Sequence, residues 1–165
     1  TAASGVHHKS DVGGVKLELA DADAVGEAYA DVAGRLGSRV VVSAMAPPGV
    51  EVALGVVNDP TFGSLVLVAA GGVLVELLHD RILAFPPLDE ARARPLIDRL
   101  RMRPLLDGAR GAPAADMGSL AHAVSRLAVL ASDLGDRLSA LDANPVIVSP
   151  DGCVAVDALV LARTD

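Results

Sequence analysis

Three residues with oxygen-bearing side chains interrupt an otherwise apolar stretch at residues 138–161. They are Asp142, Asn144 and Asp157, and their neighbours are mainly Val, Ile, Leu and Ala. Carboxylate and amide oxygens suit a hard cation such as Mg²⁺ that is held together with phosphate groups. The same residue types also end strands and form turns. Spacing alone leaves both interpretations open.

The stretch that carries these residues is predicted to be a β-hairpin. Its two apolar runs flank Ser149–Gly152, a turn segment in which Pro restricts φ and Gly accepts positive φ. A turn centred on the two middle residues sets Asn144 opposite Asp157 and leaves Asp142 two residues further along the same face. A bulge at the turn would instead shift the pairing by one residue, and Pro145 can add a compensating irregularity. The register therefore stays open.

A second polar segment, GVHHKSDVGGV, occupies residues 5–15. Neutral imidazole is nucleophilic, and glycine lets backbone amides approach an anion closely. Such a segment can accept or hold a phosphate group, although adjacent histidines are also common in solvated loops.

Two further loops contain glycine. Gly71 and Gly72 separate two apolar segments and permit a close backbone approach, either to a nucleotide phosphate or to another part of the protein. Arg110 lies in a segment bracketed by glycines, where its guanidinium can bind a phosphate or form an exposed loop salt bridge.

The composition limits the classes of function. The 165 residues suffice for one domain, and with only 2% aromatic residues its core must consist of Ala, Val and Leu. A formal net charge of -7 without a Lys/Arg cluster argues against a nucleic-acid partner. The apolar run 65–75 is shorter than the roughly 20 residues of a membrane span, so no membrane partner is expected. The single Cys153 excludes an intramolecular disulfide and fits a reducing cytoplasm.

The hydrophobic patterns predict an α+β fold with a mainly antiparallel sheet and flanking helices, in one domain at residues 1–165. Glu51 and His122 are interpreted as surface residues. Residues 39–46 and 50–58 are expected to pair as a hairpin. Helices are predicted at 21–36, 88–101 and 117–134, and further strands at 15–19, 65–70, 73–78 and 81–85.

Five motifs, taken in order, resemble the ATP-grasp domain of NDP-forming (ADP-forming) acyl-CoA synthetases, relatives of the succinyl-CoA synthetase β subunit. The resemblance covers roughly residues 5–161. It implies the C-terminal part of the ATP-grasp fold and an acid–thiol ligase that moves phosphate between acyl phosphate, histidine and ADP or ATP, with Mg²⁺ and nucleotide as cofactors. One such motif is weak, whereas five in the family's order are specific. The motifs are HKSDVGGV, EVALGVVNDPTFG, AAGGVLVELLHD, PLLDGARG, and LDANPV with the later VAVDA.

The resemblance also assigns roles to individual residues. His8 matches the histidine that receives a phosphoryl group, and Asn144 and Asp157 match the pair that binds Mg²⁺. Asp142 takes the place of an acidic residue, usually Glu, that steadies the phosphohistidine, and it is shorter by one methylene group.

The glycine-rich loop of the family matches Gly71 and Gly72, with Arg110 close to it. Here Ala69 and Ala70 stand where the family usually has Gly and Leu.

The resemblance implies partners as well. The strand-and-lysine half that usually precedes the histidine loop is missing, so the isolated chain is expected to be inactive and to work with CoA-binding and phosphohistidine-bearing domains or a subunit of the same synthetase. A cytoplasmic location is expected, and a homo-oligomer is left open. The alternative is a non-catalytic or regulatory synthetase-like domain of a protein lysine acetyltransferase, and a third interpretation is a structural dimerisation piece.

Overall fold

The computed structural model describes residue 2 and residues 9–72 and 79–163 of the chain. These residues form two compact units, one at 1–45 and one at 46–165. Each unit is described by itself below. The expected strand at 73–78 lies outside the described residues, and the expectation of a single domain stays a prediction.

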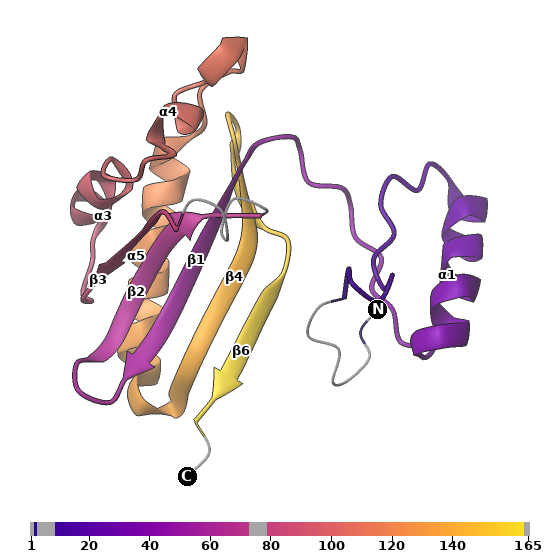
Figure 1. The fold of residues 1–165 in the computed structure, drawn as a ribbon, viewed down its shortest axis with the longest axis horizontal. Helices are drawn as coiled ribbons and strands as arrows, with labels where there is room; N and C mark the ends of the chain where they lie inside the picture. Colours follow the sequence, from indigo (N-terminus) through magenta and orange to yellow (C-terminus); the bar gives the residue numbers. More distant parts are fainter. Residues whose placement is uncertain (1, 3–8, 73–78, 164–165) are drawn as a thin grey trace. The chain divides into compact units, whose positions relative to one another are not determined.

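The larger unit is built on an antiparallel sheet of six described strands (Figure 1). The strand order is β3-β2-β1-β4-β5, and β6 also pairs with β4. Together with its helices this sheet confirms the α+β class. The strands are β1 (Val50–Asp59), β2 (Gly63–Ala70), β3 (Arg81–Ala84), β4 (Leu138–Ser149), β5 (Gly152–Ala155) and β6 (Ala158–Ala162).

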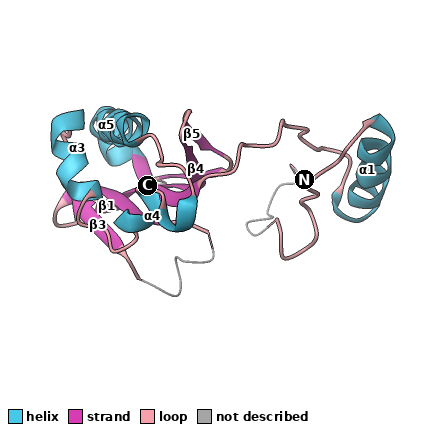
Figure 2. Cartoon of the chain, turned by 90° about the horizontal axis from the view of Figure 1, so that it is seen from above, coloured by secondary structure: helices cyan, strands magenta, loops and turns pink. Residues whose placement is uncertain are grey.

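The helices labelled α3 and α5 lie together on one side of this sheet (Figure 2). The helix α5 (Met117–Leu134) has the predicted bounds, and Asp116 caps its first turn by accepting a hydrogen bond from the Ser119 N–H. Its apolar face, including Leu120 and Val124, packs with alternate residues of the strands in the core. The other described helical segments are α3 (Glu90–Ile97), α4 (Arg103–Leu106), η1 (Ala109–Gly111) and η2 (Gly135–Arg137).

The helix α3 is shorter than predicted. Asp89 caps its first turn, since the Asp89 carboxylate accepts a hydrogen bond from the Arg92 N–H. The helix ends at Ile97, because the buried carboxylate of Asp80 binds the backbone N–H groups of Arg101 and Met102 at 2.9 and 2.8 Å and holds that segment in a turn.

The smaller unit contains the helix α1 (Ala22–Leu36), which begins at the cap Asp21 and ends at Gly37, as predicted. The Arg35 guanidinium donates to the carbonyl oxygens of Val12 and Gly13 at 3.0 and 3.1 Å and pairs with Asp31. The hydrogen bonds from Arg35 and then from Lys16 lower the pKa of Asp31 to about 2. These contacts fasten the preceding loop to the helix.

The predicted strands at 15–19 and 39–46 are wrong. Both segments lack regular secondary structure, and β1 pairs with β2 and β4 rather than with 39–46. Alternating apolar residues favour a strand, but a strand also needs a hydrogen-bonding neighbour, and the described residues of the smaller unit provide none for these segments.

Among the described residues, no helix combines the length and the apolar character needed to cross a membrane.

Candidate functional site

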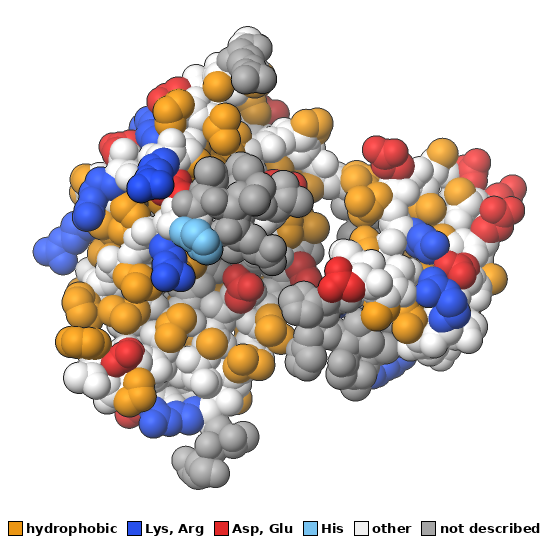
Figure 3. Space-filling view, in the orientation of Figure 1, with side chains coloured by type: hydrophobic (Ala, Val, Ile, Leu, Met, Phe, Trp, Pro, Cys, Tyr) orange, Lys and Arg blue, Asp and Glu red, His pale blue; other side chains and the backbone are white. Residues whose placement is uncertain are grey.

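The site residues predicted on the terminal hairpin lie on the face of the sheet opposite the helices. Asp142 pairs with Gly55 of β1 and with Leu159 of β6, and paired residues share a face. The core faces the other way, through Leu54 and its neighbours. Figure 3 views the larger unit from the side away from α5, and both hydrophobic and acidic side chains are visible there.

The hairpin has the register that brings the predicted residues together. Ser149 pairs with Gly152 and Ala143 pairs with Ala158, so the pairing runs without a shift across the interruption between β5 and β6. Asn144 therefore lies opposite Asp157, as predicted for a turn centred on Pro150 and Asp151.

The irregularity expected near Pro145 is present, but on the side of β4 that faces β1. Val52 pairs with Val146 and Leu54 pairs with Ala143, so one residue of β1 faces two residues of β4. The Asn144-Pro145 peptide bond is cis. This bulge lies at the position of the candidate ligand Asn144, consistent with the frequent use of bulges to direct side chains at functional sites.

The glycine pair contacts the hairpin directly. The Gly72 N–H donates to Asn144 Oδ1 at 3.3 Å, and the Gly71 N–H donates to the Glu51 carbonyl oxygen at 2.9 Å. A Cβ on Gly71 would lie 2.7 Å from the Val52 backbone. Gly72 has a φ of +57°, and a Cβ there would collide with the Glu51 carboxylate. The close approach that requires glycine is thus made to β1 of the same unit.

Two carboxylates on this face repel each other. The pKa of Asp142 is raised, first because its carboxyl group is partly desolvated between the strands and second because of the negative charge of Asp157. The Asp142 side chain still reaches solvent. This excess of negative charge beside an amide oxygen is the environment that a bound cation would relieve, so the donor set fits Mg²⁺ that also binds phosphate oxygens.

The described residues contain no group of three His, Cys, Asp or Glu side chains arranged to hold a metal ion by themselves. A cation here would therefore need ligands from a bound nucleotide or from elsewhere in the protein. His8 lies outside the described residues. Arg110 lies in η1, and its side chain is likewise outside the described part of the structure.

Sequence reasoning did not identify Asp80, which lies directly before β3. Its side chain is only 8% exposed and accepts hydrogen bonds from two backbone N–H groups. Glu51 is exposed, as predicted, and its carboxylate lies beside Gly72. A single acidic residue between two apolar segments is the signal that could have drawn attention to Asp80.

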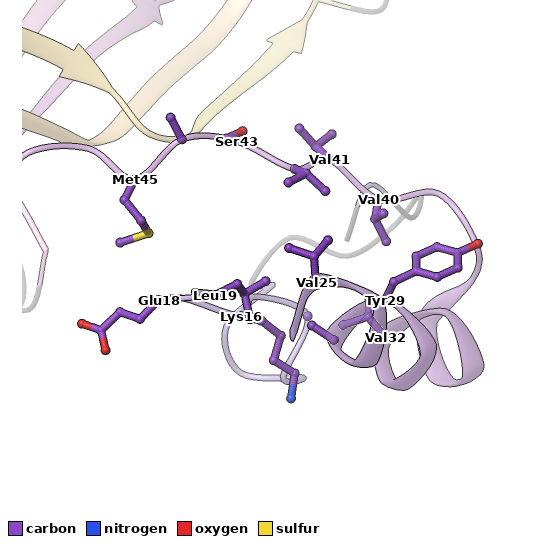
Figure 4. Close-up of a pocket in the computed structure, with 14 residues that line it drawn as sticks. Lys16, Glu18, Leu19, Val25, Tyr29, Val32, Val40, Val41, Ser43 and Met45 are labelled. Carbon is purple, nitrogen blue, oxygen red and sulfur yellow. The ribbon is translucent and has the colours of Figure 1, made fainter. Parts of the chain in front are cut away.

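Each of the two units has a hollow of its own. In the smaller unit, a cavity of about 280 Å³ is bordered by apolar side chains of α1 and of residues 40–45, and the charged ends of Lys16 and Glu18 point away from it (Figure 4). In the larger unit, a shallow hollow is lined in part by His122 and Glu90, whose Nδ1 and Oε1 atoms are 2.7 Å apart. Neither hollow contains a predicted site residue.

Comparison with known proteins places the chain in a family. Residues 1–161 match the family described as "ATP-grasp domain". The β subunit of acetate–CoA ligase (ADP-forming) I from Pyrococcus furiosus is 31% identical over 92% of this chain and 68% of that protein. Acetate–CoA ligase (ADP-forming) I from Archaeoglobus fulgidus is 35% identical over 92% of this chain, which spans 23% of that longer protein.

A solved structure shares the fold. The dinucleotide-forming acetyl-coenzyme A synthetase 1 of Ca. Korarchaeum cryptofilum, in complex with coenzyme A and Mg-AMPPCP, matches 99% of this chain and 74% of its own chain, with a TM-score of 0.89 and 36% identity. In that structure the phosphohistidine segment points towards the nucleotide-binding site. The chain therefore belongs to the ATP-grasp domain family, in the branch found in ADP-forming acyl-CoA synthetases.

Proposed function

We propose that this chain is the nucleotide-binding part of an ADP-forming acyl-CoA ligase. The reaction joins a carboxylic acid to the thiol of CoA, and phosphate moves between acyl phosphate, histidine and ADP or ATP. The observation that carries the proposal is the contact between Gly72 and Asn144 beside the repelling pair Asp142 and Asp157. The relatives named above are CoA ligases, which supports this function over a regulatory domain of an acetyltransferase.

The proposed site would neutralise the negative charges that meet during phosphoryl transfer. Transfer to a nucleoside diphosphate brings several anionic oxygens together, so catalysis depends mainly on positioning and on neutralising charge. Mg²⁺, when bound, supplies positive charge to the phosphate oxygens. Asn144 and Asp157 are the proposed ligands of Mg²⁺. The nucleotide is proposed to approach the glycine loop at Gly71 and Gly72, near Arg110.

His8 is proposed to carry the phosphoryl group. A neutral imidazole nitrogen attacks phosphorus, so an N–P bond forms as the P–O bond to the donor breaks. An oxygen of ADP then attacks the same phosphorus, and the N–P bond breaks. Asp142 is proposed to accept a hydrogen bond from the other ring nitrogen, which fixes the attacking nitrogen and stabilises the charged ring.

The activity is proposed for the full-length protein. We propose CoA-binding and phosphohistidine-bearing domains or subunits as its partners, a cytoplasmic location, and only weak Mg-nucleotide binding by residues 1–165 alone. Support for the partners comes from the similar acetyl-coenzyme A synthetase structure, which contains coenzyme A and a phosphohistidine segment.

Calorimetric titration of the full-length protein with ADP and Mg²⁺ tests the metal ligands. Asp157→Ala should weaken Mg-nucleotide binding at least about tenfold, because the loss of a charged ligand costs about 1.4 kcal/mol or more. Asp151→Ala is the matched control, since Asp151 lies in the exposed turn of the same hairpin. Equal affinities for the two variants would refute the role of Asp157.

Radiolabelled phosphate transfer tests the histidine. His8→Ala should abolish acid-labile phosphate on this domain and stop ATP formation, whereas His122→Ala, at an exposed histidine paired with Glu90, should change neither. Asp142→Asn should slow phosphoryl transfer and retain nucleotide affinity. Wild-type turnover by the His8→Ala protein would reject the relay.

A further inference from the structure

The outer edge of the sheet at β6 lacks the features that normally protect a strand edge. Among the described strands β6 pairs only with β4, and all five of its residues are exposed. It contains no charged residue and no proline between Ala158 and Ala162. Natural edge strands are usually blunted by Lys, Pro or bulges, because unpaired backbone groups invite another strand.

The opposite edge of the sheet differs from this one. There β3 is only four residues long, begins with the charged Arg81, and is followed by Pro86 and Pro87. At the β6 edge three consecutive large hydrophobic residues are 43%, 57% and 45% exposed, namely Leu159, Val160 and Leu161. The β3 edge thus carries a charge and is followed by prolines, whereas the strand β6 has neither within its bounds.

The sequence of β6 is complementary to itself. Residues 157–163 read DALVLAR, which is symmetric in its apolar part and carries opposite charges at its two ends. In an antiparallel pair of two copies centred on Val160, Leu159 faces the partner's Leu161 and Asp157 faces the partner's Arg163.

Only this register sets the two opposite charges directly across from each other at both ends. A shift of the pairing by one or two residues sets Arg163 opposite Val156 or Ala155 of the second copy and Asp157 opposite Ala162 or Leu161. Leucine pairs across strands, and opposite charges across strands, each stabilise a sheet, whereas a charge opposite an apolar residue does not. Arg163 also lies 3.7 Å from Asp136 of its own chain, an exposed and weak ion pair that leaves its other guanidinium nitrogens available.

We propose that two copies of this chain pair edge to edge through β6, antiparallel and about a two-fold axis at Val160. Such an interface is isologous, so each copy supplies the same strand and the same two charges. The apolar side chains Leu159, Val160 and Leu161 lose solvent exposure, and the unpaired backbone groups of both edges find partners. The pairing does not rest on the proposed function.

Disulfide trapping tests the register in the full-length protein. In a Cys153→Ser background, Val160→Cys sets two thiols opposite each other at the two-fold axis, and opposed residues of an antiparallel pair have a Cα separation that a disulfide can span. Mild oxidation with diamide should give a dimer that mass spectrometry identifies as linked through position 160 of both copies. Val129→Cys, at an exposed valine on α5, should give no such link.

Charge and edge variants test the affinity by analytical ultracentrifugation. Val160→Lys and Arg163→Glu should each raise the dimer dissociation constant at least about tenfold, the second because it opposes two pairs of like charges. The controls are Val129→Lys and Arg126→Glu, which make the same changes on α5 and should leave the constant unchanged. Asp157 is left unchanged because it belongs to the carboxylate pair of the candidate site.

Absence of a link through position 160, or equal dissociation constants for the edge variants and their controls, would overturn the proposal. A link from position 160 to another segment of the protein would overturn it as well, because β6 would then pair with a strand other than its own copy.

Discussion

The buried carboxylate of Asp80 fastens the backbone directly before β3 to the turn that precedes α4. Its two oxygens accept hydrogen bonds from the backbone N–H groups of Arg101 and Met102, at 2.9 and 2.8 Å. Its own carbonyl oxygen accepts from the Ala70 N–H at 3.0 Å. Asp80 therefore joins the end of β2, the start of β3 and the turn before α4.

These contacts set the magnitude of the expected effect. A hydrogen bond to a charged group contributes about 1.5 to 3 kcal/mol, and a buried N–H without an acceptor carries a similar cost. Asp80→Ala removes both acceptors, so we expect it to lower the free energy of unfolding by about 3 to 5 kcal/mol. Asp80→Asn keeps one side-chain oxygen as an acceptor, so its loss should be about half as large.

Urea unfolding followed by circular dichroism measures these changes. Asp136→Ala is the control: the Asp136 side chain is 93% exposed and its ion pair with Arg163 spans 3.7 Å, so its removal should cost less than about 0.5 kcal/mol. If Asp80→Ala costs no more than Asp136→Ala, or if Asp80→Asn and Asp80→Ala are equally unstable, the two-bond account of Asp80 is wrong.

Two further predictions concern the helices. Leu120→Ala should lower the free energy of unfolding by about 3 kcal/mol in the same urea assay, since Leu120 is fully buried. The control Leu130→Ala changes a 38% exposed residue of the same helix and should lower it much less. Similar losses for the two variants would contradict the assigned core. Arg35→Ala should raise the pKa of Asp31 from about 2 toward its ordinary 3.8, measured by NMR titration, because Arg35 supplies the largest stabilising hydrogen bond. In the wild type, the stabilisation from Asp31 should be present above pH 3.8 and fade as the pH falls toward 2, and an unchanged pKa in the variant would show that Lys16 suffices.

Local signals in the sequence predicted those parts of the fold whose causes are local. The turn residues Ser149–Gly152 predicted the hairpin, because Pro and Gly restrict the backbone over four residues. They left its register open, and the strand pairing in the structure decided between the two alternatives. Asp21 and Gly37 marked the ends of α1, since a cap acts on its own first or last turn. The alternating pattern at 15–19 led to a wrong prediction of a strand. Alternation shows that one side of a segment is apolar, but it does not show that a neighbouring strand is present to pair with it.

The arrangement of the site depended on contacts between distant residues, which no local pattern encodes. Asn144 accepts a hydrogen bond from Gly72, 72 residues away in the sequence. The need for glycine at position 71 comes from the backbone of β1. The resemblance to a known family identified these residues as a group, but only the sheet register explains how they meet.

The raised pKa of Asp142 means that its ionised carboxylate lowers the free energy of unfolding, and this effect can be measured. Its carboxyl group holds its proton more firmly in the folded protein than in the unfolded chain, so ionisation weakens the fold as the pH rises from the ordinary value of 3.8 through the folded pKa. Asp142→Asn removes the desolvated charge and its repulsion by Asp157. Without nucleotide, this variant should therefore unfold at a higher temperature than the wild type at neutral pH.

The higher melting temperature of Asp142→Asn should disappear as the pH falls below 3.8, because Asp142 of the wild type is then protonated in both the folded and the unfolded protein. At neutral pH the difference should shrink when Mg²⁺ and nucleotide are added. Asp136→Asn, at an exposed carboxylate, should show neither trend. A melting temperature of Asp142→Asn that stays at or below that of the wild type at neutral pH would mean that the two carboxylates do not destabilise the free site. Relief of repulsion between the two carboxylates would then no longer favour a cation at Asn144 and Asp157. Only the direct bonds from these ligands would favour its binding.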